Sequence, residues 1–154
     1  ARRRQSVADM VREHWRTYGR NYYSRHDYEE VDEGAAHALV GHLRSKLPGL
    51  IGTNLGGSTV AAADDFAYLD PVDGSSASGQ GLRILFEDGA RVVYRLSGTG
   101  TAGATLRVYM ERSEPDPSKQ GLEAQAALAP LIGLSRALAE IETRTGRREP
   151  SVIT

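Results

Sequence analysis

The sequence predicts an α+β fold in which a small antiparallel β-sheet is flanked by helices. Helical periodicity marks two segments before residue 50 and one after residue 117, and four β-rich runs lie between them. Two of those runs are joined around Asp88-Gly89, a pair typical of tight β-hairpins. Because the strands follow one another and the helices lie outside them, we expect the helices to cover one face of an antiparallel sheet.

The first element is a short amphipathic helix expected over residues 7–17. Ser6 and Asp9 resemble a capping box that opens it, and Gly19 is a plausible end. Its apolar side can pack on the rest of the chain or on a preceding domain. The chain starts with Ala1 rather than Met, and we expect it to begin inside a longer protein.

The other elements follow from the same signals. A second helix is expected after Asp27, whose side chain can cap it, with its end at Pro48-Gly49. The β-rich runs are residues 58–66, 82–87, 91–97 and 105–111. A last helix follows Pro117 and ends at Thr145-Gly146. We expect a kink or the true start of this helix at Pro130, because proline lacks a backbone N–H donor.

Composition limits the functions that this chain can have. Its 154 residues suffice for one domain with a buried core, and 40% apolar with 25% charged residues is ordinary for a soluble protein. The net charge of −1 gives no global positive field, which disfavours nucleic acid and acidic membranes as partners. The absence of cysteine excludes thiol catalysis and disulfides and fits a cytoplasmic location. No apolar run approaches the ~18 residues that span a bilayer.

The segment with most chemical information is residues 95–107, RLSGTGTAGATLR. Strand alternation puts Arg95 and Ser97 on one face of the first strand, and Arg107 with its neighbours Thr105 and Tyr109 on one face of the next. If the two strands pair through the loop, Arg95 and Arg107 converge near its mouth.

This loop has the chemistry of a phosphate cradle. Glycines allow backbone N–H groups to point toward one centre, and Ser97, Thr99 and Thr101 add hydroxyl donors. Guanidinium groups match the geometry of phosphate oxygens. The segment holds no nucleophile with an adjacent base, so we interpret it as a binding element. A flexible hairpin loop with two solvent-facing arginines is the alternative.

Other sites are disfavoured. Gly98, Gly100 and Gly103 match the spacing of a dinucleotide fingerprint, but a β-pattern follows where that motif needs a helix. Asp64, Asp65, Asp70 and Asp73 are candidate metal ligands, but we interpret them as turn and capping residues, because aspartates in turn sequences commonly accept hydrogen bonds from their own backbone. We interpret all four histidines as structural or surface residues: His14, His26, His37 and His42. The basic and aromatic residues between Tyr18 and Tyr28 are typical of packing, with nucleic-acid or sugar binding as the alternative.

The loop and several other segments, in the same order along the chain, resemble the phosphoglucomutase family of the α-D-phosphohexomutase superfamily. The loop resembles the phosphate-binding loop of that family's fourth, C-terminal domain, in the Ser-Gly-Thr-Gly form of the glucose-specific branch. The further matching segments are Tyr18 to Asn21, Arg25 to Val31, Asp70 to Ser75, Gly81 to Arg83, Leu128 to Ile132, Arg144 to Arg147 and Val152 to Thr154.

The resemblance implies a TATA-box-binding-protein-like fold and three regions. These are residues 1–17 as a helix at the end of the preceding domain, 18–28 as a hinge or linker, and 29–154 as the C-terminal phosphate-binding domain. Residue by residue, the phosphate loop carries over to Arg95, Ser97, Gly98, Thr99, Gly100 and Arg107, and a nearby pocket arginine carries over to Arg25.

The resemblance also implies a reaction. The full-length enzyme interconverts glucose 1-phosphate and glucose 6-phosphate through glucose 1,6-bisphosphate, using a serine and a Mg²⁺ loop in other domains. This chain is expected to bind the phosphate that is not transferred and to close the active-site cleft, to bind no metal and to be inactive alone. Its expected partners are a phosphorylated glucose and the other three domains. A free-standing phosphosugar-binding module is the alternative.

Overall fold

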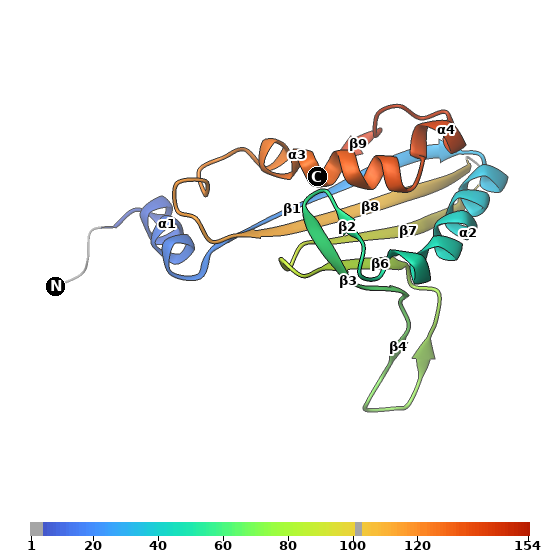
Figure 1. Cartoon of the computed structure of the whole chain (residues 1–154), viewed down its shortest axis with the longest axis horizontal. Helices are drawn as coiled ribbons and strands as arrows, with labels where there is room; N and C mark the ends of the chain where they lie inside the picture. The colour runs from blue at the N-terminus through green and yellow to red at the C-terminus, as the bar shows by residue number, and fades with distance from the viewer. Residues whose placement is uncertain (1–4, 101–102) are drawn as a thin grey trace.

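The computed structural model describes residues 5–100 and 103–154 (Figure 1). It confirms the predicted α+β fold. The helices are α1 (Val7–Tyr18), α2 (Glu33–Leu50), α3 (Ala124–Leu138) and α4 (Ile141–Thr145). The strands are β1 (Arg20–Val31), β2 (Asn54–Leu55), β3 (Ser58–Asp65), β4 (Tyr68–Leu69), β5 (Ser76–Ala77), β6 (Leu82–Phe86), β7 (Arg91–Gly100), β8 (Gly103–Glu114) and β9 (Val152–Ile153).

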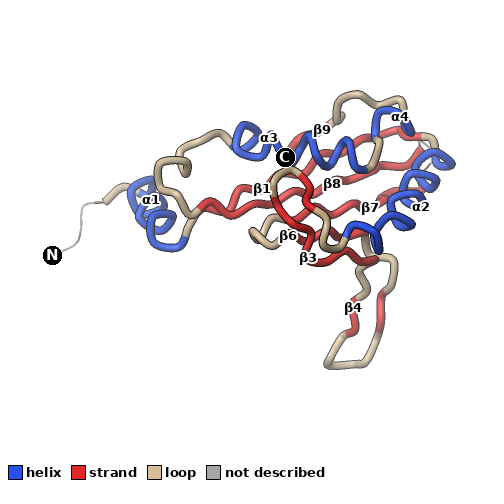
Figure 2. Tube along the Cα trace, in the orientation of Figure 1, coloured by secondary structure: helices blue, strands red, loops and turns tan. Residues whose placement is uncertain are grey.

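The described strands form one antiparallel sheet in the order β2-β3-β6-β7-β8-β1-β9, with a separate β4–β5 hairpin that projects beyond it (Figure 2). The strands joined around Asp88-Gly89 pair as predicted. The sheet therefore brings β1, from the start of the chain, between β8 and the C-terminal strand β9.

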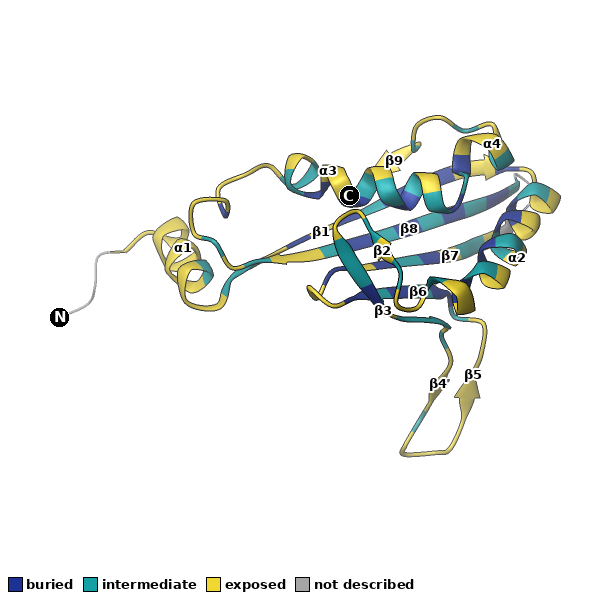
Figure 3. Ribbon diagram, viewed as in Figure 1, coloured by how far each residue is buried: buried dark blue, intermediate teal, exposed yellow. Residues whose placement is uncertain are grey.

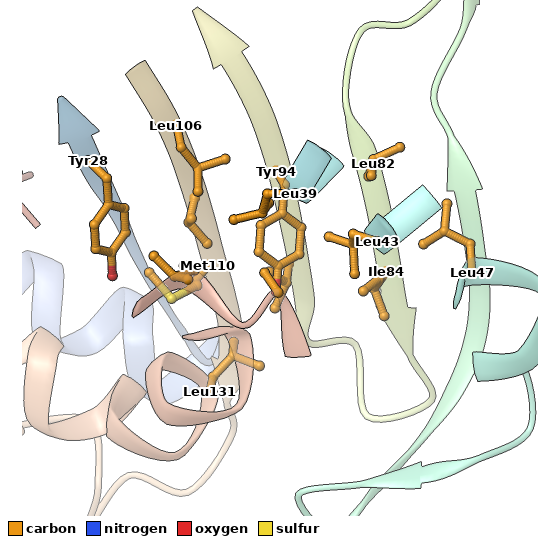
Figure 4. Packing of buried hydrophobic residues seen from close by; sticks show 14 of the residues in the cluster. Tyr28, Leu39, Leu43, Leu47, Leu82, Ile84, Tyr94, Leu106, Met110 and Leu131 are labelled. Atoms are coloured by element: carbon orange, nitrogen blue, oxygen red, sulfur yellow. The ribbon is translucent and has the colours of Figure 1, made fainter. Parts of the chain in front are cut away.

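The core lies between one face of this sheet and the helices (Figure 3). Alternate residues of the strands are buried there, and α2 contributes Leu39, Leu43 and Leu47. Figure 4 shows these leucines against Tyr94, Ile84 and other strand residues, with Leu131 of α3 near Met110. Burying each such side chain stabilises the fold by about 1.5–3 kcal/mol. We call the opposite side of the sheet, which carries Arg25, Arg95 and Arg107, the open face.

The local structure of residues 18–28 differs from our expectation of a hinge or linker. Residues 20–31 form β1, and the alternate residues Tyr22, Ser24, His26 and Tyr28 are buried. The sequence does not show this alternation as an apolar pattern, because two of the buried residues are polar. Ser24 and His26 face the core and form hydrogen bonds with Gln125 of α3. The division into domains stays a prediction.

Asp32, and not Asp27, caps α2. Its carboxylate accepts a hydrogen bond from the Ala35 amide at 2.9 Å. Asp27 instead lies inside β1, which continues to an irregularity at Glu30, where φ is +53°. The strand therefore runs four residues past the position at which we expected the helix cap.

Neither helical proline is a helix boundary as expected, and a kink at Pro130 stays a prediction. α2 continues through Pro48 to Leu50, and α3 begins at Ala124, well before Pro130. Burial of the apolar side of α3 offsets the hydrogen bond that Pro130 cannot make, so tertiary packing overrides local propensity. The break comes instead at Glu140, which has φ +51° and separates α3 from α4, and α4 ends at Gly146.

Candidate functional site

The strand register places Arg95 and Arg107 directly opposite each other on β7 and β8. On the other side of β8, Asp27 of β1 is opposite Arg107. Asp27, Arg107 and Arg95 therefore form a row across three neighbouring strands, which we call the charged row. Opposite residues in such ladders have Cα atoms about 5 Å apart. The predicted convergence of Arg95 and Arg107 is thus confirmed at the level of the backbone.

Arg25 joins this row because it precedes Asp27 by two residues and so shares its face of β1. Its Nε donates a hydrogen bond to Asp27 Oδ1 at 2.8 Å. The Nε of Arg107 lies 3.6 Å from the other carboxylate oxygen, Oδ2. The Asp27 side chain is only 5% exposed, whereas the side chains of Arg25 and Arg107 are 33% and 37% exposed. Two partly exposed arginine side chains thus share one buried carboxylate.

Arg95 is the exposed cation of the row. Within residues 5–100 and 103–154, its guanidinium has no hydrogen-bond or ion-pair partner. The base of its side chain packs closely against the backbone of Gly81, since a Cβ atom at that position would lie 2.7 Å from Arg95 Cγ. Arg95 therefore keeps its full set of N–H donors for a ligand.

The glycine-rich segment is more regular than the open loop that we expected. β7 and β8 remain paired out to Gly100 and Gly103. Ser97 is opposite Thr105 and Thr99 is opposite Ala104, so Gly98 is an extra residue, a bulge, with φ +75°. Gly103 has φ +90° and lies so close to β1 that a Cβ would be 2.8 Å from the Val31 carbonyl oxygen. Glycine is needed at both positions for these conformations.

The predicted loop residues are therefore brought to one end of the charged row. Ser97 shares the open face with Arg95, and the backbone of Gly98, Thr99 and Gly100 continues the same strand. The Thr99 side chain and residues 101–102, which include the expected donor Thr101, lie outside the part that the structure describes.

The residues that we set aside have structural contacts. Arg20 stacks on the rings of Trp15 and Tyr22, which supports the packing interpretation of that segment. Asp64 forms a bidentate pair with Arg83 and raises the pKa of that guanidinium by hydrogen bonding to it. Asp70 accepts from the amide of Val72 in a turn. Among the residues that the structure describes, no three His, Asp or Glu side chains are grouped as metal ligands.

Two features of the site were missed in the sequence. Asp27 was interpreted as a helix cap, although its i, i+2 spacing from Arg25 already placed both on one face of a strand. The C-terminal strand was also missed: Thr154 accepts a hydrogen bond from the Arg25 amide at 2.8 Å and donates one to the Arg25 carbonyl at 3.0 Å. Its short apolar pair, Val152-Ile153, gave too weak a signal to predict a strand.

Residues 20–151 match the family described as "Phosphoglucomutase-1, C-terminal domain". The chain belongs to the phosphoglucomutase family. It is 61% identical over its whole length to the phosphoglucomutase of Rhizobium radiobacter, of which it covers 28%. It is 53% identical to a probable cytoplasmic phosphoglucomutase of Arabidopsis thaliana, covering 97% of this chain and 27% of that protein.

A solved structure gives the same result for the fold. The crystal structure of Paramecium pp63/parafusin, a phosphoglucomutase in its open form, superposes with a TM-score of 0.86 at 42% identity. The match covers 97% of this chain and 25% of that one. The chain thus corresponds to the C-terminal domain and spans about a quarter of the length of the phosphoglucomutases that it matches.

The relatives carry two different locations in their names. Plant phosphoglucomutases similar to this chain are described as cytoplasmic in Pisum sativum and as chloroplastic in Solanum tuberosum. None of the described helices is long and apolar enough to cross a membrane. The cytoplasmic location of this chain stays a prediction.

Proposed function

We propose that this domain binds the non-transferred phosphate of the substrate in a cytoplasmic phosphoglucomutase that interconverts glucose 1-phosphate and glucose 6-phosphate. The observation that carries the proposal is the charged row with Arg25 beside it. Arg25 and Arg107 share the Asp27 carboxylate on the open face, and Arg95 lies opposite Arg107 in the strand register, next to a glycine-rich hairpin that reaches Gly100 and Gly103.

The charges of this group suit a phosphate dianion. Arg25, Arg95 and Arg107 carry three positive charges and Asp27 one negative charge, so the group has a net charge of +2. Guanidinium forks and phosphate oxygens form short, charge-assisted hydrogen bonds. Ser97 adds a hydroxyl donor on the same face. These donors recognise the phosphate and not the sugar carbon that carries it.

Such recognition fits a reaction through glucose 1,6-bisphosphate. That intermediate must turn around so that either phosphate can face the serine of another domain. A phosphate-binding site that accepts a phosphate on either carbon allows the bisphosphate to bind in both orientations. It also orients the other end of the sugar for phosphoryl transfer. In the full-length enzyme, Mg²⁺ bound by another domain would supply charge stabilisation to the transferred group. This domain would orient the substrate and, by closing over the cleft, exclude water.

The proposal is tested by kinetics of the full-length protein with Arg95→Ala and Arg107→Ala. A hydrogen bond to a charged group is worth about 1.5–3 kcal/mol, so kcat/KM should fall roughly 10- to 100-fold, mainly through KM. Arg91→Ala is the matched control. Arg91 lies on the same strand and face but is paired with Glu111 at 2.5 Å. Equal kinetics for wild type and both site variants would refute the proposal.

A further inference from the structure

We propose that Asp27 is a positioning residue that holds Arg25 and Arg107 by their Nε atoms and leaves their terminal amino groups free to bind the substrate phosphate. This inference rests on the proposed function and assigns a role to a buried acid that does not itself contact the ligand. Its basis is the position of one carboxylate between two guanidinium groups on neighbouring strands.

Each carboxylate oxygen of Asp27 faces a different arginine. Oδ1 accepts from Arg25 Nε at 2.8 Å, and Oδ2 lies 3.6 Å from Arg107 Nε. The Arg107 Nε is buried and makes no hydrogen bond within the described part of the chain, which leaves Asp27 Oδ2 as its counter-charge. A guanidinium has five N–H donors, one on Nε and four on the terminal nitrogens. Contact through Nε therefore leaves four donors on each arginine for phosphate oxygens.

The carboxylate itself is held in place by its strand. β1 is paired on both sides, with β8 and with β9. The Asp27 carbonyl accepts a hydrogen bond from the Ser151 amide at 2.8 Å. The backbone amide and carbonyl of Arg25 both form hydrogen bonds with the backbone of Thr154. Because Asp27 is also buried, it is a fixed point against which two long, flexible side chains are ordered before the ligand arrives. Such ordering lowers the entropy cost of binding.

Positioning and simple charge predict opposite effects of removing this carboxylate. The negative charge of Asp27 repels a phosphate dianion, so charge alone would make an Asp27→Asn variant bind phosphate more tightly. If Asp27 positions the arginines, the same variant binds more weakly, because a neutral amide is a poorer acceptor for either Nε. The sign of the change therefore separates the two roles.

The test is steady-state kinetics of the full-length protein with Asp27→Asn, beside wild type and Asp64→Asn. Asp64 pairs with Arg83 on the same face of the sheet and thus controls for loss of an Asp–Arg pair that is not part of the charged row. We expect Asp27→Asn to raise KM for glucose 1-phosphate about 10-fold with kcat changed less than about 3-fold, the pattern for lost uniform binding. Asp64→Asn should leave both unchanged. An unchanged or lower KM for Asp27→Asn overturns the inference.

Two further comparisons complete the test. If Arg95→Ala and Arg107→Ala raise KM but Asp27→Asn does not, the inference fails and the proposed function stands. If none of the three variants raises KM, the proposed function fails, and the inference that rests on it fails too. Should Asp27→Asn not fold, NMR of the 154-residue wild-type chain with glucose 6-phosphate decides. The Arg25 Nε–H signal should stay hydrogen-bonded while the terminal amino signals shift, and displacement of the Nε–H bond by the ligand overturns the inference.

Discussion

Replacing Gly81 with alanine is expected to weaken phosphate binding, because the added Cβ would displace the base of the Arg95 side chain. The new Cβ would lie 2.7 Å from Arg95 Cγ, 3.0 Å from the Tyr94 carbonyl oxygen and 3.3 Å from Val93 Cγ1. The backbone φ of +148° adds strain for any residue but glycine. Strain and crowding together should lower the free energy of unfolding by about 2–4 kcal/mol.

The displaced atom matters for function, because a shift at Cγ is carried along the whole Arg95 side chain. We expect the Gly81→Ala variant to bind glucose 6-phosphate roughly 10-fold more weakly, which corresponds to one hydrogen bond to a charged group. Urea denaturation measures the stability. Isothermal titration calorimetry measures the affinity, in buffer without urea and at a temperature at which the variant is folded.

Gly79→Ala is the matched control, since Gly79 has φ +64° but open space where its Cβ would lie. It should cost about 1 kcal/mol of stability and leave the affinity unchanged. Wild-type affinity in folded Gly81→Ala, or an equal loss of affinity in both variants, would refute the link between Gly81 and Arg95.

Three more predictions concern stability and the C-terminal strand. Hydrogen bonds from Lys46, Arg144 and His42 lower the pKa of Glu140 from 4.5 to about 2, so the stabilisation by its charged form is present above about pH 4.5 and is lost as the pH falls toward 2. Glu140→Gln should lower Tm at pH 7 by an amount that shrinks over that range, and a constant difference would contradict this. Tyr94 donates to the Ser135 carbonyl at 2.8 Å in the core, so Tyr94→Phe should cost about 1–2 kcal/mol in urea unfolding, and no change would show that bond to be unimportant. Deleting residues 152–154 removes the bonds of Thr154 to Arg25 and Ser24 and should raise KM for glucose 1-phosphate several-fold in the full-length protein, with unchanged KM as the contrary result.

The hairpin and its arginines could be predicted because their signals are local. Asp88-Gly89 fixes one turn, and strict alternation sets which face Arg95 and Arg107 share. The resemblance to phosphoglucomutases added Arg25, which no local pattern linked to the loop. The structure then showed how it is linked, through Asp27 and the β1–β8 register.

The features that were missed depend on contacts between distant segments. β1 carries polar residues on its buried side because Gln125, about a hundred residues later, provides their hydrogen bonds. β9 is two residues long and exists as a strand only because it pairs with β1. Neither the pairing nor the shared carboxylate of Asp27 can be read from periodicity, since each requires the register of strands that are far apart in sequence.

The central claim, that this domain binds phosphate without regard to the sugar, is tested most directly by NMR titration of the 154-residue chain. The ligands are glucose 1-phosphate, glucose 6-phosphate and inorganic phosphate, with Arg95→Ala and Arg107→Ala measured beside wild type. We predict that the backbone signals of residues 97–103 shift with all three ligands at similar affinity, and that each variant abolishes the response. Signals that stay unchanged at millimolar ligand, or that respond equally in wild type and both variants, would contradict the account.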